Sequence, residues 1–282
     1  MRPQQWIKNL FLFAALIFSG HLRNISDALL TVQGFILFSL AASAVYIFND
    51  IADIEQDKLH PTKSLRAIPS GKLSVQTATV VATMLFVFSI IGAFFLNMKF
   101  GMALLLYLLI NVLYSYKLKH VVIIDVMTIS AGFVLRVVAG AFLIGVPTSE
   151  WLLICTVLLS LFLGFSKRRH EITILESQAN DHRTVLAHYS PYFLDQMIGI
   201  VTASTVMSYA LYTISDETVK KFGTSDLIFT VPFVLYGIFR YLYLVHKKEE
   251  GGNPTKLALT DRPLLINIIL WIVTASFIIY RK

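Results

Sequence analysis

The segment NDIADIEQD, residues 49–57, closes a strongly apolar stretch and places four carboxylates within eight residues. An α-helix advances 3.6 residues per turn, so Asn49, Asp53 and Asp57, spaced i, i+4 and i+8, share one face. Asp50 lies beside that face, one turn before Asp53. Carboxylates combined with phosphate oxygens are ligands that suit Mg²⁺. The segment therefore indicates either a magnesium site or, as the plainer alternative, a solvated helix end.

The composition of the chain is that of a membrane protein. Of its 282 residues, 56% are hydrophobic and 15% are charged, whereas soluble domains carry about 25% charged residues. We expect an all-α integral membrane protein in which nine transmembrane helices form a single domain over residues 1–282. A bilayer-spanning helix needs about 17–25 apolar residues, and the nine candidate stretches are 7–22, 31–49, 75–96, 100–117, 121–144, 150–166, 194–214, 226–246 and 263–280.

Basic residues are distributed unevenly between the loops. If the N-terminus faces the cytoplasm, the N-terminal tail and the loops after the second, fourth, sixth and eighth predicted helices carry 16 of the 24 lysines and arginines. Because cytoplasmic loops are enriched in these residues, segment 49–57 is predicted on the cytoplasmic side of a bacterial-type inner membrane. The net charge of +7 reflects this distribution and does not indicate a nucleic-acid partner.

Cations follow the acidic segment and the fourth predicted helix. Lys63 and Arg66 lie in the loop after residue 57, and Lys119 follows Tyr114 at the end of the 100–117 stretch. Lys and Arg side chains bind the phosphate oxygens of a metal-bound diphosphate, and a tyrosine hydroxyl can hydrogen-bond to the same group. Tyr and Lys at a membrane interface are also ordinary anchors, so this alternative stays open.

The sixth predicted helix ends in KRRHE, residues 167–171. Lys167 and Arg168 are candidate phosphate ligands. Lys167 and Glu171 are also spaced i, i+4, and the plainer alternative is a helix-end ion pair worth about 0.2–0.5 kcal/mol.

Two charged residues, Asp125 and Arg136, lie inside the fifth apolar stretch. Charges within a membrane span are rare and usually face a cavity or a partner. These two are eleven residues apart and cannot touch one another, so each needs a partner on another helix or a ligand. Functional and structural roles are both open for them.

The absence of several sequence motifs argues against some classes of protein. The chain has no Walker A loop, CxxC pair, HExxH or GxSxG motif, which argues against nucleotide-hydrolysing pumps, zinc sites and serine hydrolases. The pattern N-D-x-x-D-x-x-x-D after the second of nine helices, with basic loops at 63–72, 117–119 and 167–169, resembles the UbiA superfamily of intramembrane prenyltransferases. The resemblance covers essentially the whole chain.

Members of that superfamily typically carry a second D-x-x-x-D motif after helix six, so that two acidic clusters bind two Mg²⁺ ions and a prenyl diphosphate. Here that position is the mostly basic segment 167–171. This departure, together with HPTK at 60–63 and Tyr114 followed by Lys119, resembles the branch of decaprenyl-phosphate phosphoribosyltransferases. The resemblance implies Mg²⁺-dependent transfer of 5-phosphoribose from phosphoribosyl pyrophosphate to a polyprenyl phosphate lipid, with release of pyrophosphate.

The resemblance and the charge pattern together suggest roles for individual residues. Asp53 and Asp57 are the predicted catalytic residues, and with Asp50 they form the predicted metal site. The predicted substrate-binding residues are Asn49, Asp50, Lys63, Arg66, Tyr114, Lys119, Lys167, Arg168 and Glu171. Two alternatives stay open: an aromatic prenyltransferase with a prenyl diphosphate donor, and a membrane transporter or lipid-binding protein. The oligomeric state is also open, with a homo-oligomer as one option.

Overall fold

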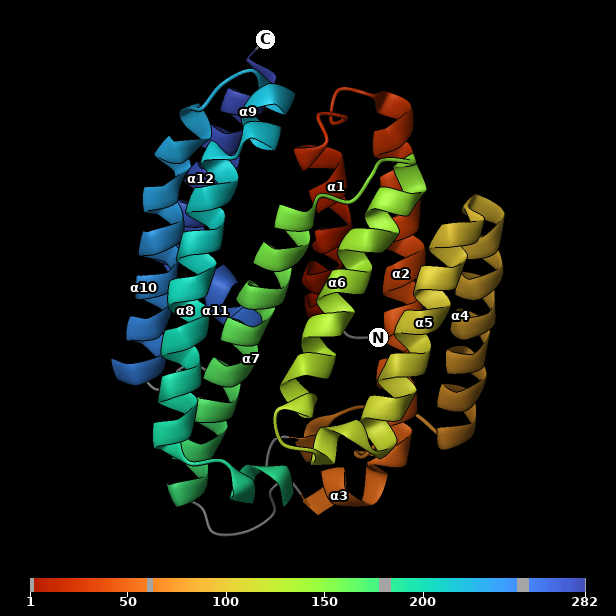
Figure 1. The fold of residues 1–282 in the computed structure, drawn as a ribbon. Helices are drawn as coiled ribbons and strands as arrows, with labels where there is room; N and C mark the ends of the chain where they lie inside the picture. Colours follow the sequence, from red (N-terminus) through yellow and green to blue (C-terminus); the bar gives the residue numbers. More distant parts are fainter. Residues whose placement is uncertain (1–2, 60–62, 178–183, 248–253, 282) are drawn as a thin grey trace. The chain divides into compact units, whose positions relative to one another are not determined.

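The computed structural model describes residues 3–59, 63–177, 184–247 and 254–281, and all regular elements in these ranges are helices (Figure 1). Among the described residues, eight helices are long and apolar enough to cross a membrane. They coincide with eight of the nine stretches predicted from hydropathy, which confirms the all-α membrane architecture. The eight are Ile25–Ala52, Val75–Leu96, Met98–Tyr116, Ile124–Ile144, Glu150–Thr173, Pro191–Ile214, Asp226–His246 and Arg262–Tyr280.

The remaining stretch, residues 7–22, is helical as far as Phe18 but is not a single long α-helix. A 3₁₀-helix, η1 (Pro3–Leu12), is followed by the six-residue α1 (Phe13–Phe18). Inside η1 the buried Asn9 donates its side-chain amide to Ser39 Oγ at 2.9 Å. A 3₁₀-helix rises about 2.0 Å per residue, so η1 is longer than an α-helix of the same number of residues, and Asn9 is its buried polar residue.

Residue contacts divide the chain into two compact units whose segments alternate along the sequence. Unit 1 consists of Met1–Leu16, His21–Lys119 and Leu135–Pro147, and unit 2 consists of Ile17–Gly20, His120–Val134 and Thr148–Lys282. Helix α6 (Ile124–Ile144) contributes its first part to unit 2 and its last part to unit 1.

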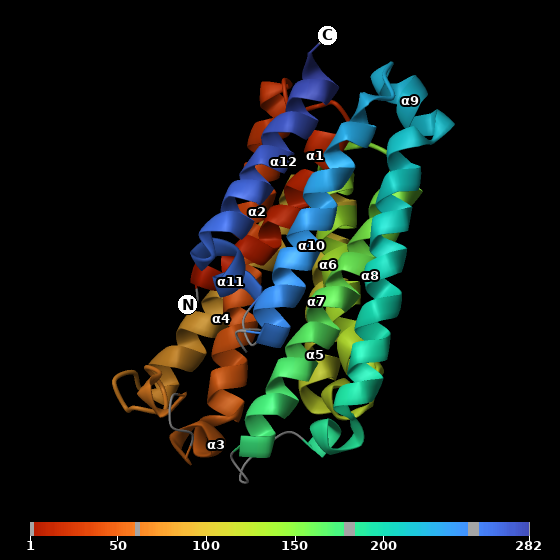
Figure 2. The ribbon, with the colours of Figure 1, turned by 90° about the vertical axis from the view of Figure 1, so that its left-hand side faces the viewer.

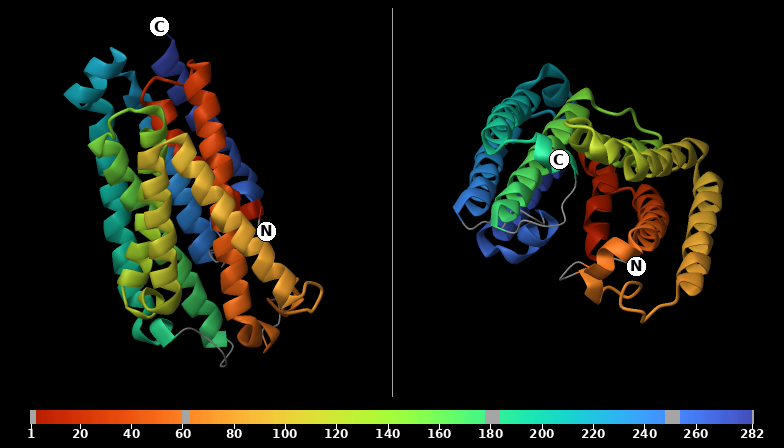
Figure 3. Two further views of the ribbon diagram at one scale, coloured as in Figure 1. Left: turned by 90° about the vertical axis from the view of Figure 1, so that its right-hand side faces the viewer. Right: turned by 90° about the horizontal axis from the view of Figure 1, so that it is seen from below.

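Unit 1 is built on α2 (Ile25–Ala52), which packs against α4 (Val75–Leu96) and α5 (Met98–Tyr116). Figure 3 shows α4 beside α2, with the 63–74 loop at its start. Fully buried alanines, including Ala41, Ala78 and Ala82, allow these helices to approach closely. Gly140 is required where α6 passes the backbone of residue 12, because a Cβ there would lie 2.0 Å from a carbonyl oxygen.

The acidic end of unit 1 is formed by short elements. Helix α3 (Ile54–Leu59) follows α2 after one residue, and the 3₁₀-turn η2 (Lys63–Leu65) precedes the loop that leads to α4. Ile47 of α2 and Ile68 of the loop are buried with two alanines of α4. This small apolar cluster holds the loop against both helices.

Unit 2 contains α7 (Glu150–Ser177), α8 (Pro191–Ile214), α10 (Val231–Lys247) and α12 (Arg262–Tyr280). Helix α7 packs against α8, and α10 contacts both α8 and α12 (Figure 2). The connecting elements of unit 2 are η4 (Thr184–His188), α9 (Asp216–Phe222), η5 (Asp226–Thr230) and α11 (Pro254–Thr260). A further short element, η3 (Leu118–His120), lies where the chain passes from unit 1 to unit 2.

Side-chain caps mark where the helices of unit 2 begin. Ser190 accepts a hydrogen bond from the Phe193 amide with proline in the first turn of α8, and Asp261 accepts from the Leu264 amide at α12. Such caps satisfy amides that have no partner within the helix.

Candidate active site

The predicted acidic segment lies at a break between two helices of unit 1. Helix α2 ends at Ala52, and Asp53 is its C-cap, with φ −95° and ψ 14°. The i to i+4 bonding pattern nevertheless crosses the break, because Asp53 N donates to Asn49 O at 3.0 Å and Asp57 N donates to Asp53 O at 2.8 Å. Glu55 points away and pairs with Lys58 at 2.8 Å. The break therefore interrupts the predicted single helix but keeps the polar residues stacked.

Arg66 binds two of the carboxylates. Its Nη1 lies 3.1 Å from Asp50 Oδ1 and 2.6 Å from Asp57 Oδ2. Because one nitrogen contacts both oxygens, the two carboxylates converge on a single positive centre. Arg66 was predicted to bind phosphate, and its contacts in this structure are with the acidic residues instead.

The convergence of Asp50 and Asp57 fits a magnesium ion. Among the described residues no group of three or more His, Cys, Asp or Glu side chains could hold a metal by itself. Mg²⁺ usually binds through one or two carboxylates and completes its shell with water and substrate phosphates. Asp53 lies between these two in sequence, is half-buried, and makes no side-chain hydrogen bond or ion pair with another described residue. The three-carboxylate metal site stays a prediction, with Asp50 and Asp57 as its best-placed pair.

Helix α5 joins the acidic segment through a residue that sequence reasoning missed. Ser115 Oγ donates to Asn49 Oδ1 at 2.9 Å. This bond brings the end of α5, which carries the half-buried Tyr114, beside the end of α2. Lys119 is half-buried in η3. The side chain of Lys63, and residues 60–62, lie outside the described part of the structure.

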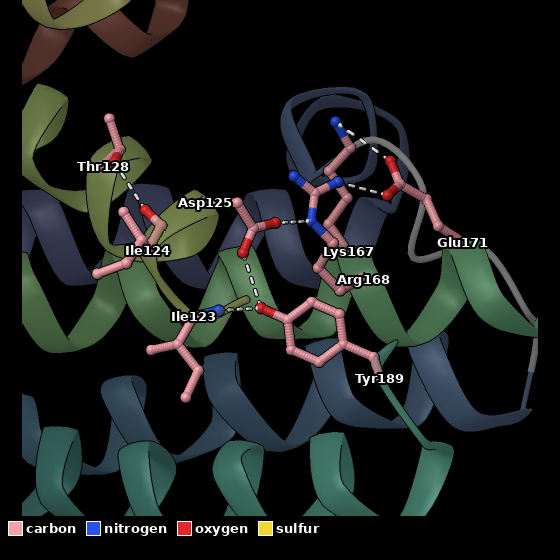
Figure 4. A network of polar contacts seen from close by, with 8 residues as sticks. All are labelled: Ile123, Ile124, Asp125, Thr128, Lys167, Arg168, Glu171 and Tyr189. Atoms are coloured by element: carbon pink, nitrogen blue, oxygen red, sulfur yellow. Dashed lines mark hydrogen bonds and ion pairs between the residues drawn. The ribbon is translucent and has the colours of Figure 1, made fainter. Parts of the chain in front are cut away.

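A second polar cluster lies in unit 2 around Arg168 (Figure 4). Arg168 Nε donates to Asp125 Oδ2 at 2.7 Å, and its Nη1 bonds to Glu171 Oε2 at 2.5 Å. The side chains of Arg168 and Asp125 are 1% and 0% exposed. We call Asp125, Arg168, Glu171 and Tyr189 the Arg168 network. The partner that sequence required for Asp125 is thus Arg168, a residue predicted to contact phosphate but found here buried between two carboxylates.

Tyr189 completes this network, and nothing in the sequence pattern pointed to it. Its hydroxyl donates to Asp125 Oδ1 at 2.7 Å and accepts from the Ile123 amide at 2.6 Å. Burial, followed by the hydrogen bond to Asp125, raises the pKa of Tyr189 above its ordinary value, so the hydroxyl stays a donor. Ile123 has φ +69°, which is strained for a β-branched residue. The hydrogen bond that the Ile123 amide donates to Tyr189 helps to hold that strained turn at the start of α6.

Lys167 is the more exposed cation of this region. Its Nζ lies 3.6 Å from Glu171 Oε1, and its side chain is 38% exposed. Glu171 therefore contacts Lys167 through one oxygen and Arg168 through the other (Figure 4). The predicted i, i+4 ion pair is confirmed, and the role of Lys167 in phosphate binding stays a prediction.

The other intramembrane charge, Arg136, has partners in unit 1. Its Nε donates to Asn9 Oδ1 at 2.8 Å and its Nη2 to the Tyr107 hydroxyl at 2.9 Å. The guanidinium also lies over the Tyr107 and Phe38 rings, at 4.7 and 5.4 Å from their centres. These contacts tie η1, α2 and α5 to α6, which favours the structural alternative for Arg136.

Comparison with known proteins places these features in a family. Residues 10–260 match the UbiA prenyltransferase family. The chain is 31% identical to the decaprenyl-phosphate phosphoribosyltransferase of Mycolicibacterium smegmatis, over 99% of this chain and 91% of the relative. It is 32% identical to the protein of that name from Mycobacterium tuberculosis, over 98% and 91%.

Among solved structures, the fold is similar to a UbiA homologue from Archaeoglobus fulgidus bound to GPP and Mg²⁺. The TM-score is 0.73 with 20% identity, covering 99% of this chain and 97% of that one. A family match over most of the chain, an all-helical membrane fold and the acidic end of α2 agree with one another. The chain therefore belongs to the UbiA prenyltransferase family.

Proposed function

We propose that this protein transfers the 5-phosphoribosyl group from phosphoribosyl pyrophosphate to a polyprenyl phosphate and releases pyrophosphate. The similarity to relatives that carry this activity in their names supports the proposal. So does the uneven distribution of Lys and Arg, which favours a site facing the cytoplasm, on the inner membrane of a bacterial-type cell.

The observation that carries the proposal is the state of the carboxylates in the Arg168 network. Asp125 and Glu171 both bond to one buried guanidinium. The guanidinium offsets one of their two negative charges, and Lys167, which pairs with Glu171, offsets the other. This leaves the two carboxylates poorly suited to hold a second metal ion. The exposed group of this region is instead a cation, Lys167. A donor with a phosphate in addition to its diphosphate, and an acceptor that is itself a phosphate, both suit such a cation.

The acidic residues of unit 1 would hold the metal. Asp50 and Asp57 converge on one positive centre, and Asp53 is the third candidate ligand. When bound, Mg²⁺ would neutralise charge on the pyrophosphate that leaves. Asn49 is oriented by Ser115 and supports this group of ligands.

The predicted basic residues would bind the remaining phosphate charge. Lys63, Arg66 and Lys119 are assigned to the donor diphosphate, with Tyr114 as a hydrogen-bond donor. Lys167 is assigned to the 5-phosphate or the acceptor phosphate. Arg168, which is buried, is reassigned from phosphate binding to holding Glu171 and α7 in place.

The proposed reaction does not need a strong general base. The bond from ribose C1 to the pyrophosphate oxygen breaks, and a bond from C1 to an oxygen of the lipid phosphate forms on the opposite face. Because the lipid phosphate is already an anion, no proton has to be removed from it before attack. The protein's main contributions are then orientation and charge neutralisation.

The test is an assay on membranes that contain the protein, supplied with labelled phosphoribosyl pyrophosphate, polyprenyl phosphate and Mg²⁺. We expect a labelled lipid that depends on both substrates. Asp57→Asn should remove the product, whereas Glu55→Gln, a charge-matched control on the exposed side of α3, should retain it. No labelled lipid, together with prenylation of 4-hydroxybenzoate from a prenyl diphosphate, would establish the aromatic prenyltransferase instead.

A further inference from the structure

Arg66 was expected to bind substrate phosphate, but in this structure it contacts two acidic residues. Arg66 Nη1 bonds to Asp50 and to Asp57 at 3.1 and 2.6 Å. These carboxylates are the two best placed to share a metal ion. A guanidinium and a magnesium ion cannot occupy the same position between them, so the two cations must compete.

The three side chains differ in how firmly they are held. Asp57 is 3% exposed and Asp50 is 16% exposed, and they lie on α3 and α2. Arg66 is 34% exposed and lies in the loop between η2 and α4. A buried carboxylate that loses its counter-charge is strongly destabilised. The carboxylates are therefore the fixed partners, and the arginine is the partner that can leave.

The structure also provides room beside the pair. A hollow of about 250 Å³ is lined by Asp50 and Arg66 at its polar end and by apolar residues of α2, α4 and the loop, among them Ile47, Ile68 and Leu73. Arg66 lines this hollow, which gives its side chain open space beside the ion pair.

We propose that Arg66 is the counter-cation of Asp50 and Asp57 when no metal is bound, and that it exchanges with Mg²⁺ when the diphosphate donor arrives. The released guanidinium then binds phosphate oxygens of the same donor. The proposal rests on the proposed function for the identity of that donor. It implies that Mg²⁺ alone binds weakly and that metal and diphosphate bind together.

The competing explanation is a permanent ion pair that only holds the loop. In that case, removing Arg66 would loosen the loop and leave metal affinity unchanged or lower. The exchange proposal predicts instead that removing Arg66 raises the affinity for the metal ion. Loss of a basic residue should strengthen the binding of a free cation because the carboxylates keep their charge and lose their competitor.

The decisive experiment measures Mn²⁺ binding to purified, donor-free protein by electron paramagnetic resonance. We expect Arg66→Gln to bind Mn²⁺ about tenfold more tightly than the unaltered protein, because a neighbouring positive charge is removed. Arg240→Gln removes an arginine from another ion pair, with Asp261 at 2.8 Å, and should leave Mn²⁺ affinity unchanged. Asp57→Asn should abolish the gain when combined with Arg66→Gln. Equal or weaker Mn²⁺ binding by Arg66→Gln overturns the proposal.

A second measurement needs no substitution and covers the case in which Arg66→Gln does not fold. Phenylglyoxal modifies accessible arginines, and mass spectrometry of the digested protein reports the extent at Arg66. We expect Mg²⁺ alone to increase modification of Arg66, and Mg²⁺ with pyrophosphate to decrease it. No increase with saturating Mg²⁺ also overturns the proposal. Neither measurement uses phosphoribosyl pyrophosphate or lipid, so a failed transferase assay leaves this result standing, and the reverse also holds.

Discussion

Replacing Arg168 with methionine should lower the free energy of unfolding by about 3–5 kcal/mol, because the change leaves the Asp125 carboxylate buried without its ion-pair partner. The two side chains are 1% and 0% exposed, and their contact is 2.7 Å long. Tyr189 still donates one hydrogen bond to Asp125. We therefore expect the lower end of the range, about 3 kcal/mol, or roughly a hundredfold in the unfolding equilibrium constant.

A double-mutant cycle separates the ion pair from the packing of the arginine. Asp125→Asn alone should cost less than Arg168→Met, because Arg168 keeps its bond to Glu171. The double variant removes both charges, and replacing a buried pair as a whole is often nearly neutral. Its cost should fall short of the sum of the single costs by about 1–3 kcal/mol.

The assay is unfolding in mixed micelles with increasing dodecyl sulfate, followed by circular dichroism. Arg169→Met is the matched control, since Arg169 pairs with Asp195 at 3.0 Å but the two side chains are 23% and 39% exposed. A partly exposed pair of this kind is worth about 0–1 kcal/mol. If Arg168→Met and Arg169→Met cost the same, or if the cycle shows no coupling, the reasoning about the buried pair is refuted.

Four further outcomes are expected. Asp53→Ala should abolish transfer while the protein stays folded by size-exclusion chromatography, and near-normal turnover would remove it from the metal site. Lys167→Met should raise KM for the phosphate substrate that it binds and change kcat less, which steady-state kinetics with each substrate varied will decide. Chelation of divalent metal should stop turnover, and adding Mg²⁺ back should restore it; activity that survives chelation would contradict the metal assignment. Because the pKa of Tyr189 is raised in the folded protein, the unfolded chain loses this proton first, so stability should fall as pH rises above about 10, and Tyr189→Phe should reduce that fall.

Most of the helices follow from hydropathy alone. A membrane-spanning segment must satisfy its backbone hydrogen bonds internally, so a long apolar stretch becomes a helix whatever its neighbours are. Eight stretches behaved in this way. The stretch at 7–22 forms a 3₁₀-helix followed directly by a short α-helix. Its polar residue Asn9 bonds to Ser39 and Arg136, which are remote in sequence. Its conformation depends on contacts that hydropathy does not describe.

The residues of the candidate site also differ in whether they could be predicted from local sequence. The acidic segment could be recognised because its spacing is local and the helix period is fixed. The role of Arg168 could not be recognised in this way, because its burial depends on a contact with Asp125, 43 residues away. In the sequence, Arg168 is one of several neighbouring basic residues and nothing distinguishes it from them. Tyr189 carried no signal, since a single tyrosine between two helices is commonplace.

The sequence by itself determined the membrane class, eight of the helices and the acidic residues that a metal would need, because each depends on composition or on spacing within one helix. Only the tertiary structure decided which charges pair. It placed Arg66 on Asp50 and Asp57, and it buried Arg168 against Asp125. The strength of an ion pair depends on distance and burial, and both are set by which segments become neighbours after folding.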